Sequence, residues 1–496
     1  MWVREVQWSW GRCSTRGRAA VISLCLALWT GCANDSDPRS TLPHPNIIFL
    51  TVDTLRPDHM ALYGYARDTM PAIEAFAKTA VVFDSAVVPR GSTRPSYASM
   101  LTGLYPYRHG VHANRIELHS DVPTLQEGLK MAGYHTAAFV SNFVLIKELS
   151  GLAQGFDVYD DFVDEKETNR NYYERTAART LGAILKWLNS GPPEPFFLFT
   201  NFIDPHGPYR PPETYREMFQ SERRRELSID EIPRYQVYGD KLNYYDYVDR
   251  YDGEIGFTDA VLGLLIAELK SKGLWDNAIV VFTADHGESL GEHGLYFEHK
   301  LHLWEETVRV PMAIRIPGLT EPGRASALCS PMDLPATLYE YLGLQPETVL
   351  DGKSLLSCLR GEDAPKRSLL IEAPRIEEQG TIGAFAIRTA THKLIQVEDM
   401  KDKTVVRLDV FDVENDPLEQ NRIAFDQNVD VHRELRAELD KALTNLWSHK
   451  LSFKPKFYYV PNEERRTFVF GRLQTTEQRE FTPEQAEQLQ SLGYVR

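Results

Sequence analysis

Acidic and imidazole side chains follow three apolar segments of the sequence, at the points where these segments end. Asp53 follows the first segment, Asp285 and His286 follow another, and Asp204 and His206 lie just after a third. Two carboxylates and a neutral imidazole suit one divalent cation. A single Asp at such a position more often caps a helix, so the prediction depends on the three ends meeting. We therefore predict a metal site that includes Asp53, Asp285 and His286.

A threonine stands where a helix is expected to begin. Within residues 89–103, Pro95 suits the first turn of a helix and Gly103 suits its end. Thr93 would then lie at or just before the helix N-terminus, where unpaired N–H groups favour an anion. Thr93 or Ser92 could equally do no more than cap this helix, which is the commonest role of such residues. The local sequence leaves both roles open.

These side chains need a sheet to position them. Continuous apolar runs are typical of strands that are covered on both faces. Five such runs occupy residues 46–52, 136–140, 196–199, 278–282 and 311–316. Helical periodicity is clearest over 257–270. We predict an α/β fold with a doubly wound, mostly parallel sheet flanked by helices, in which ligands bind at the carboxyl ends of the strands.

The pattern of the sequence changes after about residue 365. Alternating segments at 384–388 and 404–411 predict a small antiparallel sheet, and a helix is expected over 432–446. A further helix with clear capping signals is expected near the C-terminus. We therefore divide residues 46–496 into three parts. These are a catalytic domain over 46–364, a smaller C-terminal α+β subdomain over 365–460, and a tail helix within 461–496.

The composition indicates a globular protein. The 496 residues are 43% hydrophobic and 25% charged, which excludes a wholly disordered chain and a coiled coil. The 55 basic and 70 acidic side chains give a formal net charge of −15. Because a general nucleic-acid binder needs a basic face, we expect no nucleic-acid partner.

The first 31 residues are typical of an export signal of the bacterial lipoprotein type. A basic start is followed by a short apolar stretch over 19–29 and by small residues before Cys32. We expect lipid attachment at Cys32, with a cleaved signal or an uncleaved anchor as alternatives. Residues 32–45 would form a linker. The protein would then be exported to the periplasm or the outer membrane, and this anchor would attach it to a membrane.

Two cysteines lie beyond Cys32, namely Cys329 and Cys358. Export would permit a disulfide between them, and two ordinary buried thiols are the alternative. The sequence leaves both alternatives open.

Several segments in a fixed order resemble the sulfatase family of the alkaline-phosphatase superfamily. The first metal-binding segment of that family resembles residues 51–59, its nucleophile helix 93–103, its histidine loop 204–209, and its second metal segment 283–288 with 309–311. Each match alone is weak, whereas their order is specific. The resemblance spans about residues 46–425 and implies an alkaline-phosphatase-like fold and a metal-dependent ester hydrolase.

The nucleophile position departs from the family pattern. Typical members place a Cys or Ser there that is oxidised to formylglycine, whereas this chain has Thr93, which would give a ketone and not an aldehyde. Tyr97 stands where an Arg is usual, and residues 140–143 replace a Gly-Lys-Trp-His element. The pattern is closer to threonine-nucleophile relatives in the superfamily, which act on phosphate esters and phosphonates or transfer phosphoglycerol.

The resemblance implies that Asp53, Asp285, His286 and the Thr93 oxygen hold one divalent metal ion. An alcohol bound to such an ion loses its proton more readily, so Thr93 would attack the central P or S atom. The candidate ions are Mn, Zn and Ca. The imidazole of His286 favours Mn or Zn over Ca, which prefers oxygen ligands.

Other residues are expected around the nucleophile. His206 or His299 would protonate the leaving group, and Arg56, Arg94 or Lys300 would stabilise the oxygens of the transferred group. For each of these residues, a satisfied histidine or a surface cation is an equally good interpretation.

The sequence leaves the substrate class open. A threonine ester cannot collapse by the carbon–oxygen cleavage that formylglycine allows, so water must attack P or S directly, which is harder for sulfate. We therefore hold sulfate and phosphate-type esters nearly equal, carried by a small molecule, a glycan or a lipid. The alternatives are a phosphodiesterase or phosphonate hydrolase, a phosphoglycerol-type transferase, and a non-catalytic member that binds an anionic glycan or lipid head group.

Overall fold

The computed structural model describes residues 44–166, 173–299, 303–373, 382–399 and 401–456. The expected export signal, the lipid attachment at Cys32, most of the linker, Lys300 and the C-terminal tail helix lie outside the described residues. No helix in these ranges is long and apolar enough to cross a membrane.

Eight strands form the main sheet, in the order β12-β2-β11-β8-β1-β7-β3-β4. Their bounds are β1 Asn46–Val52, β2 Val81–Val87, β3 His135–Phe139, β4 Val158–Asp160, β7 Phe196–Phe202, β8 Ala278–Ala284, β11 Arg309–Arg315 and β12 Gly323–Cys329. Strand β11 runs antiparallel to β2 and β8, and the other pairs are parallel. Strands β1, β7 and β8 are buried along their whole length, as their apolar sequences predict. The predicted mostly parallel sheet is confirmed.

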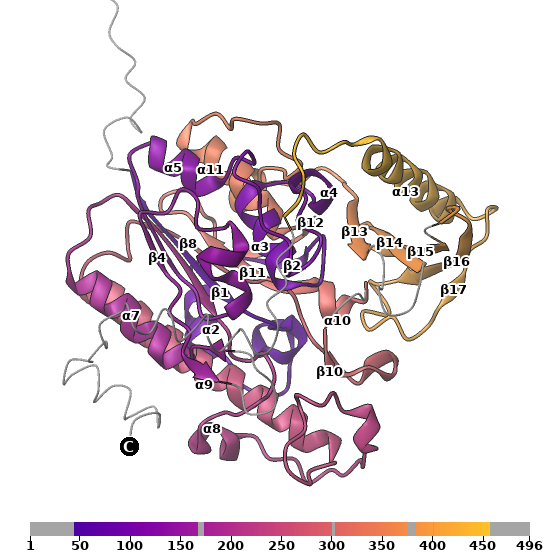
Figure 1. Ribbon diagram of the computed structural model, residues 1–496, viewed down its shortest axis with the longest axis horizontal. Helices are drawn as coiled ribbons and strands as arrows, with labels where there is room; N and C mark the ends of the chain where they lie inside the picture. The colour runs from indigo at the N-terminus through magenta and orange to yellow at the C-terminus, as the bar shows by residue number, and fades with distance from the viewer. Residues whose placement is uncertain (1–43, 167–172, 300–302, 374–381, 400, 457–496) are drawn as a thin grey trace, which may run out of the picture. The chain divides into compact units, whose positions relative to one another are not determined.

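Helices cover both faces of this sheet (Figure 1). Helix α3 (Thr93–Thr102) contacts α5 (Leu125–Met131) and α11 (Leu334–Leu342). Helix α9 (Tyr244–Ser271) contacts α2 (Pro71–Ala77) and α7 (Ala177–Asn189). Shorter elements are α4 Pro106–His109, α6 Lys147–Ser150, α8 Glu213–Met218, α10 Glu305–Val308, α12 Leu356–Leu359, β5 Glu165–Lys166, β6 Tyr173–Glu174, β9 Ser289–Leu290 and β10 Tyr296–Glu298. The predicted layers of helices on the two faces are confirmed.

The register of the central strands brings the candidate ligands to one edge of the sheet. Val52, the last residue of β1, pairs with Phe202 of β7 and with Ala284 of β8. The three parallel strands therefore end at the same level. Because Asp53 and Asp285 are the next residues after β1 and β8, their side chains emerge side by side.

A second sheet lies in the C-terminal part of the chain. Five strands pair antiparallel in sequence order: β13 Leu369–Ala373, β14 Ile382–Arg388, β15 His392–Asp399, β16 Val405–Asp412 and β17 Ile423–Ala424. Helix α13 (Asp430–Ser448) packs against β14 and β15 (Figure 1). It buries leucines spaced by three or four residues, namely Leu435, Leu439, Leu443 and Leu446. The predicted small antiparallel sheet and its helix are confirmed.

Cys329 and Cys358 are buried free thiols. Of the two alternatives that the sequence left open, the structure shows the unbridged one. Burial raises the pKa of both thiols, which keeps them protonated and unreactive.

Candidate active site

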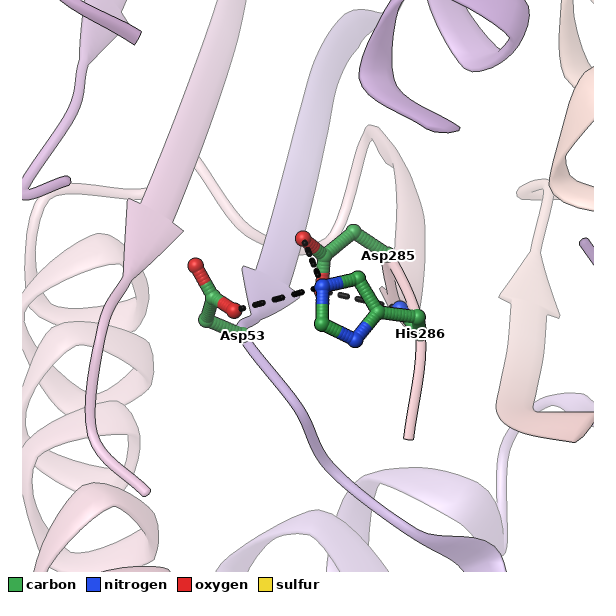
Figure 2. A group of neighbouring side chains, drawn as sticks. All are labelled: Asp53, Asp285 and His286. Carbon is green, nitrogen blue, oxygen red and sulfur yellow. Dashed lines mark hydrogen bonds and ion pairs between the residues drawn. The ribbon is translucent and has the colours of Figure 1, made fainter. Parts of the chain in front are cut away.

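Three side chains converge at the carboxyl edge of the main sheet (Figure 2). Asp53, Asp285 and His286 each offer one ligand atom, and these atoms lie within 4.8 Å of one another. The Nε2 atom of His286 lies 3.5 Å from Asp285 Oδ2 and 3.9 Å from Asp53 Oδ1. All three side chains are fully buried. The structure thus brings together the three residues predicted as metal ligands.

Hydrogen bonds to the backbone orient His286 and Asp285. The Nδ1 atom of His286 lies 2.8 Å from the Gly287 carbonyl oxygen, which can only accept, so Nδ1 carries the proton. The lone pair of Nε2 therefore faces the two carboxylates, as a metal-binding imidazole requires. The Oδ1 atom of Asp285 accepts from the N–H groups of Thr54 and His286. This leaves Oδ2 of Asp285 directed towards Nε2 of His286.

Two carboxylate oxygens in this group are buried without a hydrogen-bond partner, Asp53 Oδ1 and Asp285 Oδ2. Buried polar atoms are normally paired, and leaving an oxygen of a carboxylate unpaired is costly. A divalent cation between these oxygens and His286 Nε2 would satisfy all three atoms. The residues therefore fit such an ion.

The electrostatics of the site lead to the same conclusion. Burial raises the pKa of Asp285 to about 8, and burial together with the nearby Asp285 raises the pKa of Asp53 well above its usual range. Burial and the neighbouring His299 lower the pKa of His286 to about 4. Without a cation, this group therefore favours neutral side chains. A bound cation would reverse the cost of ionising the carboxyl groups.

Thr93 reaches this group from helix α3, of which it is the first residue. Its side chain is buried, and its Oγ1 lies 3.3 Å from Nε2 of His286. Neither alternative capping residue caps the helix with its own side chain. Ser92 is the N-cap residue and makes no capping hydrogen bond, whereas Asn114 Oδ1 accepts from the N–H of Arg94. The capping interpretation of Thr93 is therefore wrong for this structure.

Two histidines lie beside the same group. The ring of His299 is 4.4 Å from the ring of His286 and 5.0 Å from the ring of His206, measured between centroids. Nδ1 of His206 lies 2.8 Å from the carbonyl oxygen of Gly207, and Nδ1 of His299 lies 3.0 Å from Oε1 of the buried Glu288. The structure brings both predicted proton donors together, with their Nδ1 atoms engaged by the protein.

The two predicted cations that the structure describes have other contacts. The guanidinium group of Arg56 contacts Asp58 and lies 2.9 Å from Glu292 Oε1. The guanidinium group of Arg94 donates to the carbonyl oxygens of Val144 and Ile116.

Both arginine side chains are almost completely buried. These contacts favour a structural role for Arg56 and Arg94, in which they hold loops in place. The contacts do not favour the predicted role of binding substrate oxygens.

Three residues near the site were not assigned a role from the sequence. Asn142 donates to Asp53 Oδ2 at 2.7 Å, Glu288 contacts His299, and the hydroxyl of Tyr97 contacts Thr51. Asn142 lies three residues after the end of β3, so its position close to a strand end was a usable signal. The contact of Tyr97 with Thr51 joins residues that are 46 positions apart in the sequence.

Comparison with known proteins gives a consistent result. The family model described as Sulfatase matches residues 45–344, and the model described as N-sulphoglucosamine sulphohydrolase, C-terminal, matches residues 291–448. An ulvan-active sulfatase of Formosa agariphila is 26% identical over 92% of this chain and 90% of its own length. A choline-sulfatase of Rhizobium meliloti is 26% identical over 77% of this chain and 83% of its own length.

Solved structures share the fold. A protein in complex with its substrate D-glucosamine-2-N,6-O-disulfate superposes with a TM-score of 0.67 at 22% identity, over 82% of this chain and 99% of the other. The phosphonate monoester hydrolase of Agrobacterium radiobacter superposes with a TM-score of 0.65 at 20% identity, over 84% and 100% of the two chains. Since the first family model covers more than half of the sequence, the chain belongs to the sulfatase family of ester hydrolases.

Proposed function

We propose that this protein cleaves anionic sulfate or phosphate-type esters with Thr93 as its nucleophile, at a site that binds one divalent cation. The observation that carries the proposal is the position of the Thr93 hydroxyl, 3.3 Å from His286 Nε2, the atom that also faces two carboxylates with unpaired oxygens. A residue whose only role was to begin a helix would not need to point its hydroxyl towards His286.

Asp53, Asp285, His286 and Thr93 would hold the cation. A bound divalent cation lowers the pKa of an alcohol and stabilises negative charge on the transferred group. We propose Mn or Zn over Ca, because an imidazole is among the ligands and Ca prefers oxygen.

The reaction itself is carried by the chain's own residues. The Thr93 hydroxyl gives its proton to solvent, and its oxygen forms a bond to P or S while the bond to the leaving alcohol breaks. His206 or His299 supplies the proton that the leaving oxygen takes up. Water then attacks P or S of the threonine ester, the bond to the Thr93 oxygen breaks, and sulfate or phosphate is released. One proton of this water goes to Thr93, and the histidine regains its proton from solvent.

The relatives indicate the kind of substrate to test first. Proteins similar to this chain include an ulvan-active sulfatase and a choline-sulfatase. We infer an anionic ester of a glycan or a small alcohol. Because Thr93 cannot become formylglycine, phosphate-type esters need to be tested beside sulfates.

We also propose that the protein is exported and anchored to a membrane through a lipid on Cys32. This proposal rests on the basic start, the short apolar stretch and the small residues before that cysteine. Labelling with a radioactive fatty acid, with Cys32→Ser as the control, would test it.

Trapping the covalent intermediate tests the nucleophile and the substrate class together. The protein would be incubated with an aryl sulfate or an aryl phosphate, quenched in acid, digested, and analysed by mass spectrometry. We expect a sulfo or phospho group on Thr93, and none in Thr93→Ala. Turnover that is equal in the two proteins would contradict the proposal. Substrate binding without turnover in either protein would support the non-catalytic alternative.

A further inference from the structure

One asparagine links a candidate metal ligand to the segment that departs most from the family pattern. Asn142 lies within residues 140–143, just after β3, and is 5% exposed. Its Nδ2 donates to Asp53 Oδ2 at 2.7 Å. The usual sulfatase pattern has no asparagine at this position, so the contact between Asn142 and Asp53 is a departure of this chain from that pattern.

The direction of the Asn142 amide is fixed by its second contact. Asn142 is the N-cap of the 3₁₀ segment η4 (Phe143–Leu145), and its Oδ1 accepts from the N–H of Val144 at 3.0 Å. A backbone N–H can only donate, so the oxygen of the amide must face Val144. The NH₂ group therefore faces Asp53, and the two contacts together leave the side chain one orientation.

Hydrogen bonds also fix the backbone before Asn142. The N–H of Ser141 donates to Asn201 Oδ1 at 3.2 Å, and its hydroxyl donates to the Asn201 carbonyl at 2.6 Å. The Nδ2 atom of Asn201 in turn donates to the hydroxyl of Tyr97 at 2.9 Å. All four residues are at most 5% exposed. Tyr97 and Ser141, which stand where the family pattern has Arg and Lys, thus form a neutral network beneath the site.

This network determines which oxygen of Asp53 is available. Oδ2 accepts from Asn142, whereas Oδ1 is buried without a hydrogen-bond partner, 3.9 Å from His286 Nε2. A neutral donor such as the Asn142 amide fixes the orientation of the Asp53 carboxylate without neutralising it, so its negative charge remains available to a cation. A Lys or Arg at the same place would form an ion pair with Asp53 and compete with the cation.

We propose that Asn142 is a positioning residue that holds Asp53 Oδ1 towards His286 and so sets the affinity of the site for a divalent cation. This inference rests on the proposed function, because it assumes that the site binds such an ion. Partners of metal ligands contribute strongly to affinity, and their loss typically weakens binding by about 10- to 100-fold.

Calorimetric titration of the full chain with Mn²⁺, after removal of metal by a chelator, tests the proposal. Asn142→Ser keeps a hydroxyl that can accept from Val144 but loses the donor to Asp53. We expect the Kd for Mn²⁺ to rise by about 10- to 100-fold. In the background of Asp53→Ala, the same substitution is expected to change the Kd less than twofold, since the carboxylate it positions is gone. Asn142→Thr replaces the serine variant if that variant does not fold.

Asn243→Ser is a matched control, because Asn243 is also a buried N-cap asparagine that donates to a carboxylate, Asp246 Oδ1, at 2.9 Å. It is expected to leave the Kd within twofold. Equal Kd values for the wild type and Asn142→Ser would overturn the inference, as would equal weakening by Asn243→Ser. If the wild type binds Mn²⁺ and Asp285→Asn does not, the proposed metal site stands in either case. A wild type that binds no Mn²⁺ would overturn both.

Discussion

Thr93 is the residue on which the proposed chemistry depends. It begins helix α3, where Asn114 accepts from the N–H of Arg94, and the Thr93 hydroxyl faces His286 instead. This hydroxyl is buried and lies 3.3 Å from His286 Nε2, the atom that also faces two unpaired carboxylate oxygens. Its chemical purpose can be tested directly.

Thr93→Ala is expected to lower kcat/KM by about 10³-fold or more, because the attacking oxygen is removed while binding groups remain. Thr93→Ser keeps an attacking oxygen and is expected to retain measurable turnover. Steady-state kinetics with aryl sulfate and aryl phosphate would measure both variants, and thermal denaturation would verify that they fold. Alanine and serine variants with the same kcat/KM would contradict the assignment.

The buried carboxyl groups make the metal-free protein sensitive to pH. Burial raises the pKa of Asp285 from 3.8 to about 8, so the folded state holds a proton that the unfolded state has lost. This contribution lowers stability as the pH rises through that range. His286, whose pKa falls from 6.5 to about 4, acts in the opposite direction only below pH 6.5. Between pH 6.5 and 8, the carboxyl effect therefore acts without opposition from His286.

We predict that Mn²⁺ raises the melting temperature more at pH 8 than at pH 6.5. At the lower pH the ion must displace a proton from Asp285, whereas near pH 8 about half of these carboxyl groups have already lost it. Thermal denaturation in EDTA and in excess Mn²⁺ at the two pH values would measure the difference. The same shift at both values would count against a metal site at Asp285, and Asp285→Asn provides the control without this titrating group.

The positions of the candidate metal ligands could be predicted from the sequence, whereas the contacts of the candidate substrate-binding arginines could not. Asp53 and Asp285 directly follow apolar strands, and strand ends are readable from a short window of residues. Whether Arg56 or Arg94 is available to bind a substrate depends on partners that are distant in the sequence, such as the Glu292 carboxylate and the Val144 carbonyl. No local pattern contains that information.

At the scale of elements, the loop after β8 contains two candidate metal ligands, Asp285 and His286, and also Glu288, which contacts His299. Gly287 separates His286 from Glu288, and its N–H donates to the Thr307 carbonyl at 3.0 Å. A Cβ added at Gly287 would lie 2.1 Å from the carbonyl oxygen of Glu306. The absence of a side chain there allows the loop to lie against α10.

Gly287→Ala is expected to destabilise the protein by about 1–3 kcal/mol, because backbone must move to make room for the methyl group. It is also expected to weaken Mn²⁺ binding, since His286 is the adjacent residue. Gly323→Ala is the matched control, because a Cβ at Gly323 would meet nothing within 4 Å. Chemical denaturation of the two variants would measure the stability difference, and equal values would contradict this explanation.

Two of the elements that sequence reasoning missed or shortened have buried charges or exposed faces. Helix α9 begins at Tyr244, thirteen residues before the range predicted from its periodicity. Its first half buries Asp249 and Asp252, which pair with Arg67. Polar residues therefore occupy inward positions of the helix, and this hides its apolar periodicity. Strand β12 is largely exposed over its first residues and showed no apolar run.

At the scale of the whole molecule, the two sheets are joined by buried ion pairs. Glu305, in the segment that leads into β11, contacts Arg388 of β14 and lies 3.1 Å from Lys393 of β15. Lys393 is fully buried and also lies 2.8 Å from Glu419 Oε1. Although burial opposes it, Arg388 and Lys393 lower the pKa of Glu305 to about 2. The C-terminal sheet is therefore fixed to the segment next to the active-site loop.

Lys393→Met should show how much this junction contributes. The substitution leaves the buried carboxylate of Glu419 without its cation, and breaking one side of a buried ion pair typically costs about 3–5 kcal/mol. We expect a loss of this size in urea denaturation. Lys272→Met removes a partly exposed pair with Glu268 and is expected to cost less than about 1 kcal/mol. If the two variants lost equal stability, the junction would be no stronger than a surface contact. The C-terminal sheet would then need another means of attachment to the catalytic part.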